Sequence, residues 1–593
     1  MNWHDWPVTE TPAQPAPGDR STSPSVARDV RRWWEWAVTY QIYVRSFADS
    51  NGDGIGDLPG ISARIPYLRE LGVDAIWLTP CFPSPQFDHG YDVADYCDIE
   101  PAYGTLADFD HLVATSKAHD MRVLLDIVPN HCSIEHPWFK RALAAGPGSE
   151  ERDWFYFRDG TGIDGSAPPN NWRSLFGGPA WHRTTNPDGS PGQWYLHMFA
   201  PEQPDLNWGH ESVPQAFDDA LRFWFDRGVD GFRVDAVLVV GKQPLEKDTP
   251  PFPDDAPPTD VFPHQLRFGG QVHTLMERWR ALADAYEATH PGRELVFVSE
   301  AYADIDELAT YVGPTRFHTS FEFDLLLCNW QPDRMRAYID NAMTGLGGRG
   351  LPMTWTINNH DTQRSATRMG HTDAHRPSSF TDNNLLHSDE PVDPQLGLAR
   401  SNALVLVTAA LPGSMYLYYG EELGLPEVLD LPEWALQDPI WLRSEHTIRG
   451  RDGCRVPFPW TTDPATNFGF STPPGAANVA QSWLPQPSTW GNFAASGQLG
   501  DPASVLTLYR TMLDLRARHL RDPSPANFSW LPSQPTVIAF RNASISVIAN
   551  LGDDPVDLHP YLATGRVVLR SNPLPDANDL LPGDAVWILE NPR

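Results

Sequence analysis

The sequence predicts an α/β protein, a (β/α)8 TIM barrel that carries an inserted domain after its third strand and a C-terminal antiparallel β domain. Two observations support this prediction. From Trp33 onward, eight short apolar stretches with strand character alternate with helical patterns, which is typical of a parallel barrel. After about Arg521 the pattern changes to short strands separated by Pro, Gly and Asp turns, which favours an antiparallel sheet.

The barrel strands are expected where apolar, β-branched and aromatic residues cluster. Their predicted ranges are 38–44, 75–79, 123–128, 231–237, 295–300, 319–325, 354–358 and 415–419. Helical patterns fall between them, for example at 61–71, 106–119 and 214–227. Four short strands are expected in the C-terminal part, at 536–540, 544–550, 565–569 and 585–589.

Two further segments interrupt the alternation. The third and fourth strands are too far apart for one crossover, and the chain between them is dense in Trp, Gly, Pro and Asn, which indicates an inserted domain. A Pro- and Asp-rich stretch at 241–270 is expected to form a loop on the substrate side. The expected domains are a disordered, Pro- and Ser-rich arm at 1–30, the barrel at 31–131 and 209–521, the insertion at 132–208, and the β domain at 522–593.

Composition excludes several classes of partner. The formal charge of −32 over 593 residues repels phosphate backbones and anionic lipid, so nucleic acid and membrane surfaces are disfavoured. The 23 tryptophans suit a large core and also suit sugar binding.

Five scattered cysteines, an odd number without metal-ligand spacing, predict free thiols in a reducing compartment. No signal peptide and no apolar run of about 20 residues is visible, so we expect a cytoplasmic protein. The oligomeric state stays open.

Four of the apolar stretches end in polar, ionisable residues. These ends are Asp-Ile-Val-Pro-Asn-His at 126–131, Gly-Phe-Arg-Val-Asp-Ala at 231–236, Val-Ser-Glu-Ala at 298–301 and Ile-Asn-Asn-His-Asp at 357–361. In a (β/α)8 barrel the C-terminal ends of the strands meet at one face, where active sites are built. The four motifs therefore predict an active site at that face.

Arg233 and Asp235 share one face of their predicted strand, because alternate residues of a strand point the same way. A guanidinium in that place keeps a carboxylate ionised, as a carboxylate nucleophile requires. One such pair is more often a structural ion pair. Three carboxylates in order at three strand ends, Asp235, Glu300 and Asp361, favour a catalytic interpretation.

With these motifs the chain resembles the alpha-amylase superfamily of glycoside hydrolases, and within it the alpha-glucosidases and oligo-1,6-glucosidases. The resemblance extends from about residue 33 to residue 593. It implies that Asp235 is the nucleophile and Glu300 the general acid/base of a retaining hydrolysis. The apolar residues before Glu300 suit a raised pKa. Asp361 matches the third carboxylate of the family, which grips sugar hydroxyls in the transition state.

The resemblance also implies a set of substrate-binding residues. Tyr91 resembles the stacking platform under the reactive glucose. Asp88 would bind hydroxyls, and Arg233 would hold Asp235 ionised. The others are His131 and His360, which match two histidines that bond the glucose, and Arg451 and Arg455, which match two arginines placed over the pocket. An Asp88–Arg451 pair would close the far side of the pocket, so that only a chain end enters.

Two details locate the subgroup. The motif Gln-Pro-Asp-Leu-Asn at 203–207 resembles that of oligo-1,6-glucosidases, alpha-glucosidases and close relatives rather than that of endo-acting amylases. Ala236, directly after the nucleophile, resembles the maltase-type enzymes, whereas the isomaltose-cleaving type usually has valine there. The resemblance therefore implies a preference for alpha-1,4 bonds.

A possible metal loop follows the first strand. Oxygen ligands at every second residue around a Gly turn suit a hard divalent cation. The candidate ligands are Asp49, Asn51, Asp53, Ile55 through its backbone oxygen, and Asp57. An EF-hand is disfavoured because Gly60 stands where the bidentate glutamate would be. The loop resembles the structural calcium or magnesium loop of alpha-glucosidases, and no catalytic cofactor is implied.

The sequence thus predicts an exo-acting, retaining alpha-glucosidase that releases glucose from short alpha-glucosides through a covalent glucosyl-Asp235 intermediate. One alternative uses the same site: a transglucosidase or glucoside isomerase, in which a sugar hydroxyl replaces water as acceptor. The other is a non-catalytic scaffold like the heavy subunits of amino-acid transporters. Those subunits carry a membrane span and usually lose the catalytic carboxylates, and neither feature is seen in this sequence.

Overall fold

The structure is a computed structural model. It describes residues 32–242, 245, 248–249, 269–371, 391–473, 479–563, 565–572 and 578–591. The expected arm at 1–30 lies outside these residues, as does most of the expected loop at 241–270.

Eight parallel strands close into a barrel in the order β1-β11-β10-β9-β8-β7-β3-β2, which confirms the predicted fold class. Their bounds are β1 Val38–Ile42, β2 Ala75–Leu78, β3 Arg122–Ile127, β7 Gly231–Val234, β8 Val296–Ser299, β9 Thr319–Glu322, β10 Thr354–Thr356 and β11 Ser414–Tyr418. Several strands end earlier than predicted because a short helix follows at once. The chain enters α1 (Val44–Phe47) directly after β1, and α6 (Val237–Val240) directly after β7.

Helices surround the barrel. The longer ones are α2 Leu58–Leu71, α3 Leu106–Ala118, α5 Ser212–Asp226, α8 Gly269–Thr289, α11 Pro332–Gly345, α13 Pro394–Ala409 and α16 Val505–His519. The shorter ones are α9 Ile305–Tyr311, α10 Asp324–Leu327, α12 Ser365–Arg368, α14 Pro439–Arg443 and α15 Ala495–Gln498. Two further short helices lie away from the barrel, α4 Pro137–Ala145 in the insertion and α17 His559–Leu562 in the C-terminal part. Helix α2 begins three residues before the predicted start because the Asp57 side chain caps it, accepting a hydrogen bond from Gly60 N.

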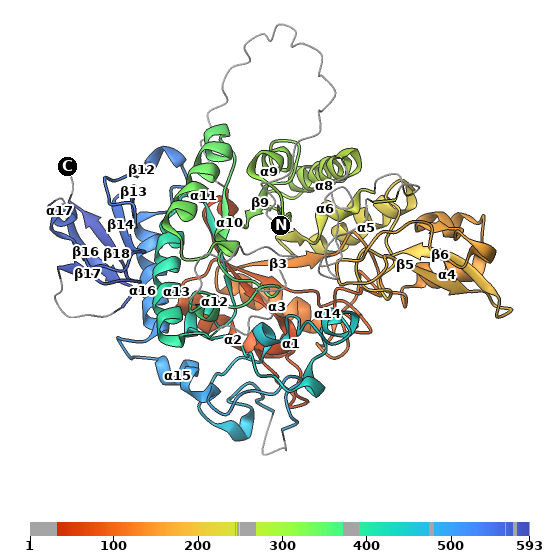
Figure 1. Cartoon of the computed structure of the whole chain (residues 1–593), viewed down its shortest axis with the longest axis horizontal. Coiled ribbons are helices and arrows are strands. Elements are labelled where there is room, and N and C mark those ends of the chain that lie inside the picture. Colours follow the sequence, from red (N-terminus) through yellow and green to blue (C-terminus); the bar gives the residue numbers. More distant parts are fainter. Residues whose placement is uncertain are drawn as a thin grey trace, which may run out of the picture.

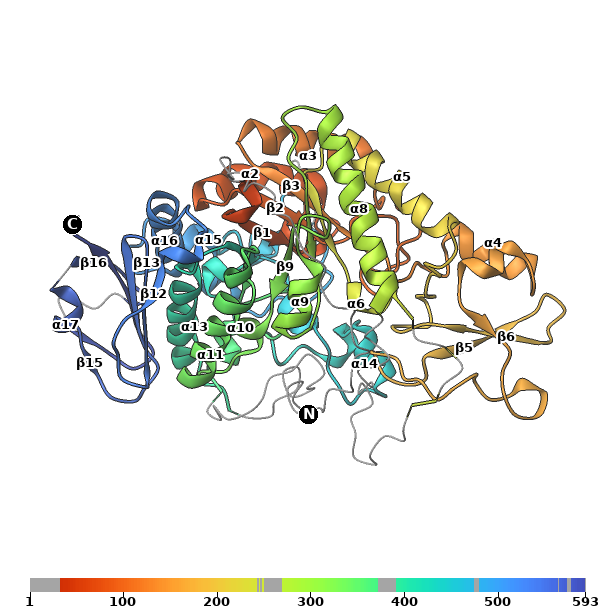
Figure 2. The ribbon, with the colours of Figure 1, turned by 90° about the horizontal axis from the view of Figure 1, so that it is seen from above.

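The insertion after β3 has its own small sheet. Strands β4 (Phe157–Arg158), β6 (Pro191–Leu196) and β5 (Trp181–Thr185) pair in that order. Their core is aromatic: the ring of Phe139 packs 5.1 Å from that of Phe155 and 5.0 Å from that of Tyr195. Figures 1 and 2 show this segment at one end of the molecule and the C-terminal sheet at the other, with the barrel between them.

The C-terminal part forms the predicted antiparallel sheet, in the order β12-β13-β14-β18-β16. Its strands are β12 Phe528–Trp530, β13 Val537–Asn542, β14 Ile545–Asn550, β16 Gly565–Arg570 and β18 Ala585–Glu590, beside a pair formed by β15 Val556–Asp557 and β17 Asp579–Leu580. Buried Trp587 fixes the sheet to the barrel, because its indole donates to Leu406 O of α13 at 2.9 Å.

The structure bears on two expectations from the sequence, the free thiols and the lack of a membrane span. All five cysteines are free, and four of them are buried. Among the described residues, no helix is long and apolar enough to cross a membrane.

Candidate active site

One cavity at the C-terminal ends of the barrel strands gathers most of the predicted site residues. It is lined by Asp88, Tyr91, His131, Asp235, Glu300, His360, Asp361 and Arg451, together with Leu175, Phe176, Phe199, Ala236, Leu238, Val239 and Tyr302. Of the two predicted substrate-binding residues that do not line the cavity, Arg233 lies behind Asp235 and Arg455 lies behind Asp361. The loop at 49–57 contributes no lining residue.

Arg233 is the centre of one half of the site. Its guanidinium pairs with Asp126 at 2.9 Å, with Glu300 at 2.9 Å, and with Asp235 through a short contact. Asp235 and Glu300 therefore both contact one cation. A retaining glycosidase needs its two carboxyl groups close together, about 5–5.5 Å apart, and a shared guanidinium brings these two near each other.

Burial and mutual repulsion oppose the ionisation of the three carboxylates around Arg233. Burial raises the pKa of Asp126 to about 7 against the attraction of Arg233. Burial also raises the pKa of Glu300 and that of Asp235, and each carboxylate raises the pKa of Asp235 further by repulsion. The expectation that Arg233 holds Asp235 ionised stays a prediction, since Arg233 lowers the pKa of Asp235 while burial and the neighbouring carboxylates raise it. The pair titrates as a unit, and a reaction by double displacement uses the form with the proton on Glu300.

The backbone after β7 positions Glu300. Ala236 adopts the left-handed conformation, with φ 43° and ψ 40°, between the strand and α6. This turn aims its amide at the acid, and Ala236 N donates to Glu300 Oε2 at 2.8 Å. The residue that the sequence singled out for its small side chain therefore also acts through its backbone.

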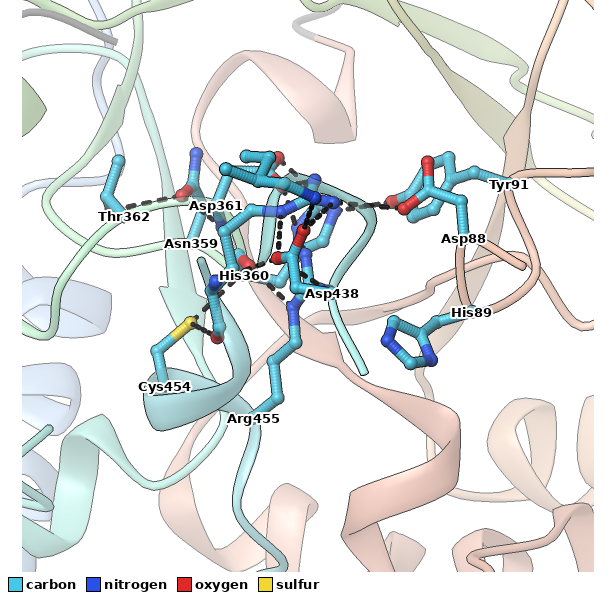
Figure 3. A network of polar contacts seen from close by, with 12 residues as sticks. Asp88, His89, Tyr91, Asn359, His360, Asp361, Thr362, Asp438, Cys454 and Arg455 are labelled. Carbon is cyan, nitrogen blue, oxygen red and sulfur yellow. Dashed lines mark hydrogen bonds and ion pairs between the residues drawn. The ribbon is translucent and has the colours of Figure 1, made fainter. Parts of the chain in front are cut away.

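Arg451 is the centre of the other half, and Figure 3 shows the three carboxylates that it pairs with, Asp88, Asp361 and Asp438. It pairs with Asp88 at 3.0 Å, with Asp361 at 2.8 Å and with Asp438 at 2.7 Å, which includes the predicted Asp88–Arg451 pair. Arg455 contacts Asp361 at 3.3 Å. Burial opposes ionisation of Asp361, but its cationic surroundings lower its pKa to about 2. Because burial keeps His360 neutral, the two arginines supply that charge at neutral pH.

His360 has a defined orientation. Gln41 Nε2 donates to His360 Nδ1 at 2.8 Å, so the proton of the neutral ring sits on Nε2. That nitrogen faces Tyr91 Oη at 2.6 Å, and the two rings lie parallel at 5.3 Å. The Tyr91 hydroxyl also donates to Asp126 Oδ2 at 3.1 Å, which links both halves of the site.

The motif at 203–207 acquires a physical explanation. The Gln203 amide lies 3.0 Å from His131 Nε2 and donates to Asp88 Oδ2 at 3.1 Å, so one side chain holds two predicted sugar-binding residues. Asp205 accepts from Asn130 at 3.1 Å and pairs with buried Lys242 at 2.9 Å. The motif therefore ties the insertion to the loops after β3 and β7.

Sequence reasoning missed several residues that build the site. Asp126 is the first residue of the motif at 126–131, so its position near the end of a predicted strand could have identified it as a site residue. No sequence pattern marks Asp438 or Lys242, because each takes part in the site only by pairing with a residue distant in the sequence. The apolar side of the cavity was also missed, since its residues come from two separate segments.

In the candidate metal loop, two of the predicted carboxylate ligands accept hydrogen bonds from backbone amides of the same loop. Asp49 accepts from Gly52 N at 2.6 Å and from Gly54 N at 2.9 Å, and Asp57 accepts from Ser50 N at 3.0 Å. Gly54 has φ 89°, and a Cβ there would lie 2.2 Å from Gln481 O, so the turn requires glycine. Among the residues that the structure describes, no three His, Cys, Asp or Glu side chains are grouped to hold a metal ion.

A cation in this loop would therefore depend on the Asn51 amide and the Ile55 carbonyl as well as on carboxylates. Such an all-oxygen donor set suits Ca²⁺ or Mg²⁺, and a carboxylate oxygen that accepts one hydrogen bond keeps a second lone pair. The predicted ligands thus fit a hard cation chemically.

Comparison with known proteins identifies the family. The family model described as the alpha amylase catalytic domain matches residues 41–522. The chain belongs to the alpha-amylase family. Maltase 1 of Drosophila virilis is 35% identical over 522 residues, which cover 85% of this chain and 76% of the relative. The resemblance inferred from the motifs is confirmed, and membership of this alpha-amylase family makes the chain a glycoside hydrolase.

Two solved structures are similar to this chain over almost its whole length. The alpha-glucosyl transfer enzyme XgtA is 33% identical, with a TM-score of 0.77, and the match covers 95% of this chain and 100% of that one. An isomaltulose synthase from Erwinia rhapontici NX5, solved with its natural substrate sucrose, is 28% identical, with a TM-score of 0.78 and the same coverage.

Proposed function

We propose that the protein is an exo-acting, retaining alpha-glucosidase. Asp235 attacks the anomeric carbon while Glu300 donates its proton to the departing oxygen. Glu300, now a carboxylate, then takes a proton from the water that cleaves the glucosyl-Asp235 ester. The observation that carries the proposal is the placement of Asp235 and Glu300 against one guanidinium inside a cavity lined by the predicted sugar-binding residues.

The Asp88–Arg451 pair supports the exo mode. Both side chains are about 95% buried, and their ion pair stands at the cavity wall with Gln203 behind it. A pocket closed in this way admits the non-reducing end of a chain and excludes its interior. The substrates that fit are short alpha-glucosides.

A second function uses the same groups. If a sugar hydroxyl displaces water from the second step, the enzyme becomes a transglucosidase or a glucoside isomerase. The similarity to XgtA and to an isomaltulose synthase favours keeping this alternative. Incubation with maltose, isomaltose, trehalose and sucrose, followed by separation of all products, tests both. Free glucose as the main product supports hydrolysis, new disaccharides support transfer, and the absence of cleavage contradicts both.

Asp88→Ala is expected to weaken binding of short substrates. The change opens the far wall and removes a hydroxyl-binding carboxylate, so KM for maltose should rise about tenfold or more while kcat changes less. It also releases one of three carboxylates from Arg451, which still holds Asp361 and Asp438. Steady-state kinetics measure the effect, and efficient cleavage inside long starch chains by the native enzyme would contradict the closed pocket.

Ala236→Val tests linkage preference. The Ala236 side chain lines the cavity beside the nucleophile, and two added methyl groups should change discrimination between linkages by roughly 1–3 kcal/mol. We expect the native enzyme to prefer maltose, and the variant to shift toward isomaltose in kcat/KM. A β-branched residue is disfavoured at positive φ, so Tm must be measured alongside. An unchanged ratio would assign linkage to the segment at 241–270.

We further propose that the loop at 49–57 holds a structural Ca²⁺ or Mg²⁺. A cation that binds only the folded state stabilises it, by about 2.7 kcal/mol at 100 times its Kd. Chelation should therefore lower Tm, and Asp53→Ala should lower it without changing the chemistry. Thermal denaturation with and without chelator, combined with elemental analysis, decides the matter. An unchanged Tm in protein shown to lack metal would contradict the site.

A further inference from the structure

A second cavity lies on the outside of the barrel. It has a volume of about 290 Å³, and none of its described lining residues belongs to the cavity of the candidate active site. Three segments form it: residues 94–97 after β2, the start of α4 in the insertion, and the first half of α5. Figure 2 shows α4 next to one end of α5, so this cavity lies where the insertion meets the barrel.

Much of the wall of this outer cavity is aromatic. The rings of Tyr96 and Phe217 pack 4.8 Å apart, and the Trp138 ring lies 4.9 Å from that of His136. Tyr96, His136 and Phe217 are each at most 7% exposed, so the wall needs little ordering when a ligand binds. Three small residues on the wall leave the space between the rings open: Ala94, Ala216 and Ala220.

His136 brings a hydrogen-bond donor to the outer cavity. Its Nδ1 accepts from Trp138 N at 3.1 Å and so caps α4. Burial and the nearby Arg141 lower the pKa of His136 to about 4, so its ring is neutral at neutral pH and carries its proton on Nε2. Among the described residues, no group accepts a hydrogen bond from this Nε2. Because a buried donor without a partner is costly, an oxygen of a ligand in the cavity would gain by bonding to it.

One acid and one base also line the outer cavity, and both are exposed. One carboxylate oxygen of Asp95 accepts from Cys97 N at 2.8 Å. The guanidinium of Arg141 lies over the Trp154 ring at 4.9 Å. The two formal charges cancel, so the cavity suits a neutral ligand with hydrogen-bonding groups better than an ion.

We propose that the outer cavity is a second sugar site, which binds one free hexose such as glucose and takes no part in catalysis. The sugar ring would lay its C–H face on the Trp138 indole, while its hydroxyls accept from His136 Nε2 and donate to Asp95. The volume suits one ring rather than a chain. An apolar ligand would leave the His136 donor without a partner. The inference goes beyond the proposed function, because none of these residues takes part in the reaction.

Tyr96 connects the outer cavity to the candidate active site. Its ring lines the outer cavity, and its hydroxyl donates to His131 O at 2.8 Å. His131 in turn lines the cavity at the strand ends. The experiment must therefore distinguish a sugar bound in the outer cavity from one bound in the active site.

Cys97 provides a local readout, because it lines the outer cavity and the other four cysteines are buried. Alkylation by iodoacetamide at one fixed alkaline pH, followed by peptide mass spectrometry, measures its accessibility. A ligand at ten times its Kd leaves about one cavity in eleven open, so the alkylation rate of Cys97 should fall about tenfold in saturating glucose. A rate that stays constant up to about 100 mM glucose would overturn the proposal. Equal protection by cyclohexanol would overturn the assignment to a sugar.

A matched pair of variants locates the protection. Trp138→Ala removes the aromatic platform, so the glucose concentration for half-protection should rise about tenfold. Trp434→Ala makes the same change at a residue that is 72% exposed and lies outside the outer cavity, and this concentration should not change. Each variant is compared with and without glucose, so a change in the basal reactivity of Cys97 cancels.

Asp95→Asn guards against misfolding of Trp138→Ala. Asp95 is exposed, and asparagine keeps an acceptor for Cys97 N, so the fold should survive. Loss of the carboxylate should raise the concentration for half-protection about threefold or more. If neither Trp138→Ala nor Asp95→Asn changes this concentration, the outer cavity is not the sugar site and the proposal fails.

Two active-site variants separate this inference from the proposed function. Asp88→Ala should weaken sugar binding in the active site and leave the protection of Cys97 unchanged. A rise in the concentration for half-protection that parallels the rise in KM would place the effect in the active site and overturn the inference. Asp235→Ala should keep the protection although its turnover is lost, so the outer site can be confirmed or refuted whatever reaction the enzyme performs.

Discussion

Asp235→Ala should lose essentially all turnover of maltose and of aryl alpha-glucosides. Without the carboxylate no glucosyl ester forms, and knock-out of a covalent nucleophile costs roughly four orders of magnitude or more in kcat. The fold should survive, because Arg233 keeps Asp126 and Glu300 as partners. Initial rates, with circular dichroism to verify folding, measure the effect.

Chemical rescue makes this prediction specific. Azide is small enough to enter the space vacated in Asp235→Ala, and a single displacement from that side would give beta-glucosyl azide. The control Asp219→Ala removes a carboxylate from an exposed position on α5 and should leave the rate unchanged. Near-full activity of Asp235→Ala on maltose would exclude Asp235 as nucleophile.

Glu300→Gln should lose most activity on maltose and much less on activated aryl glucosides. A sugar leaving group needs a proton from the acid, and general acid catalysis contributes about 10²–10⁴-fold, whereas a nitrophenolate leaves almost unaided. Glutamine keeps the size of the side chain and the acceptor for Ala236 N. Comparing kcat/KM for the two substrate classes in native enzyme and variant gives the result.

The pH profile adds a second readout. Burial raises the pKa of Glu300, so its acid form persists toward neutral pH and is lost as pH rises through that raised pKa. Native activity should therefore fall on the alkaline side. Glu300→Gln should lack this alkaline limb, because glutamine has no proton to lose. An identical alkaline limb in both proteins would assign it to another group.

The eight strands of the barrel could be predicted from sequence because apolar, β-branched and aromatic residues cluster in each of them. The ends could not. β7 stops at Val234 because Ala236 turns into the left-handed region, and no local preference of alanine indicates that. The C-terminal sheet was predicted more closely, since β13 and β14 follow their predicted ranges within two residues.

The site was predictable where a motif carried it. Asp235, Glu300 and Asp361 follow three strands whose ends must meet, so their approach followed from topology. The triple role of Arg451 depends on Asp438, and the anchoring of Asp205 depends on Lys242. These contacts join segments that are distant in the sequence, and no repeating pattern of residues indicates that they meet. The same is true of the protonation of Asp235, which depends on how many buried carboxylates share Arg233.

The configuration of the first sugar released tests the roles of Asp235 and Glu300 most directly. With an aryl alpha-glucoside as substrate, all glucose comes from the reacting ring, and proton NMR distinguishes its anomers before they interconvert. Double displacement through Asp235 predicts that alpha-glucose appears first and the beta anomer only later, by mutarotation. Beta-glucose as the initial product would show a single inversion and would contradict the covalent intermediate.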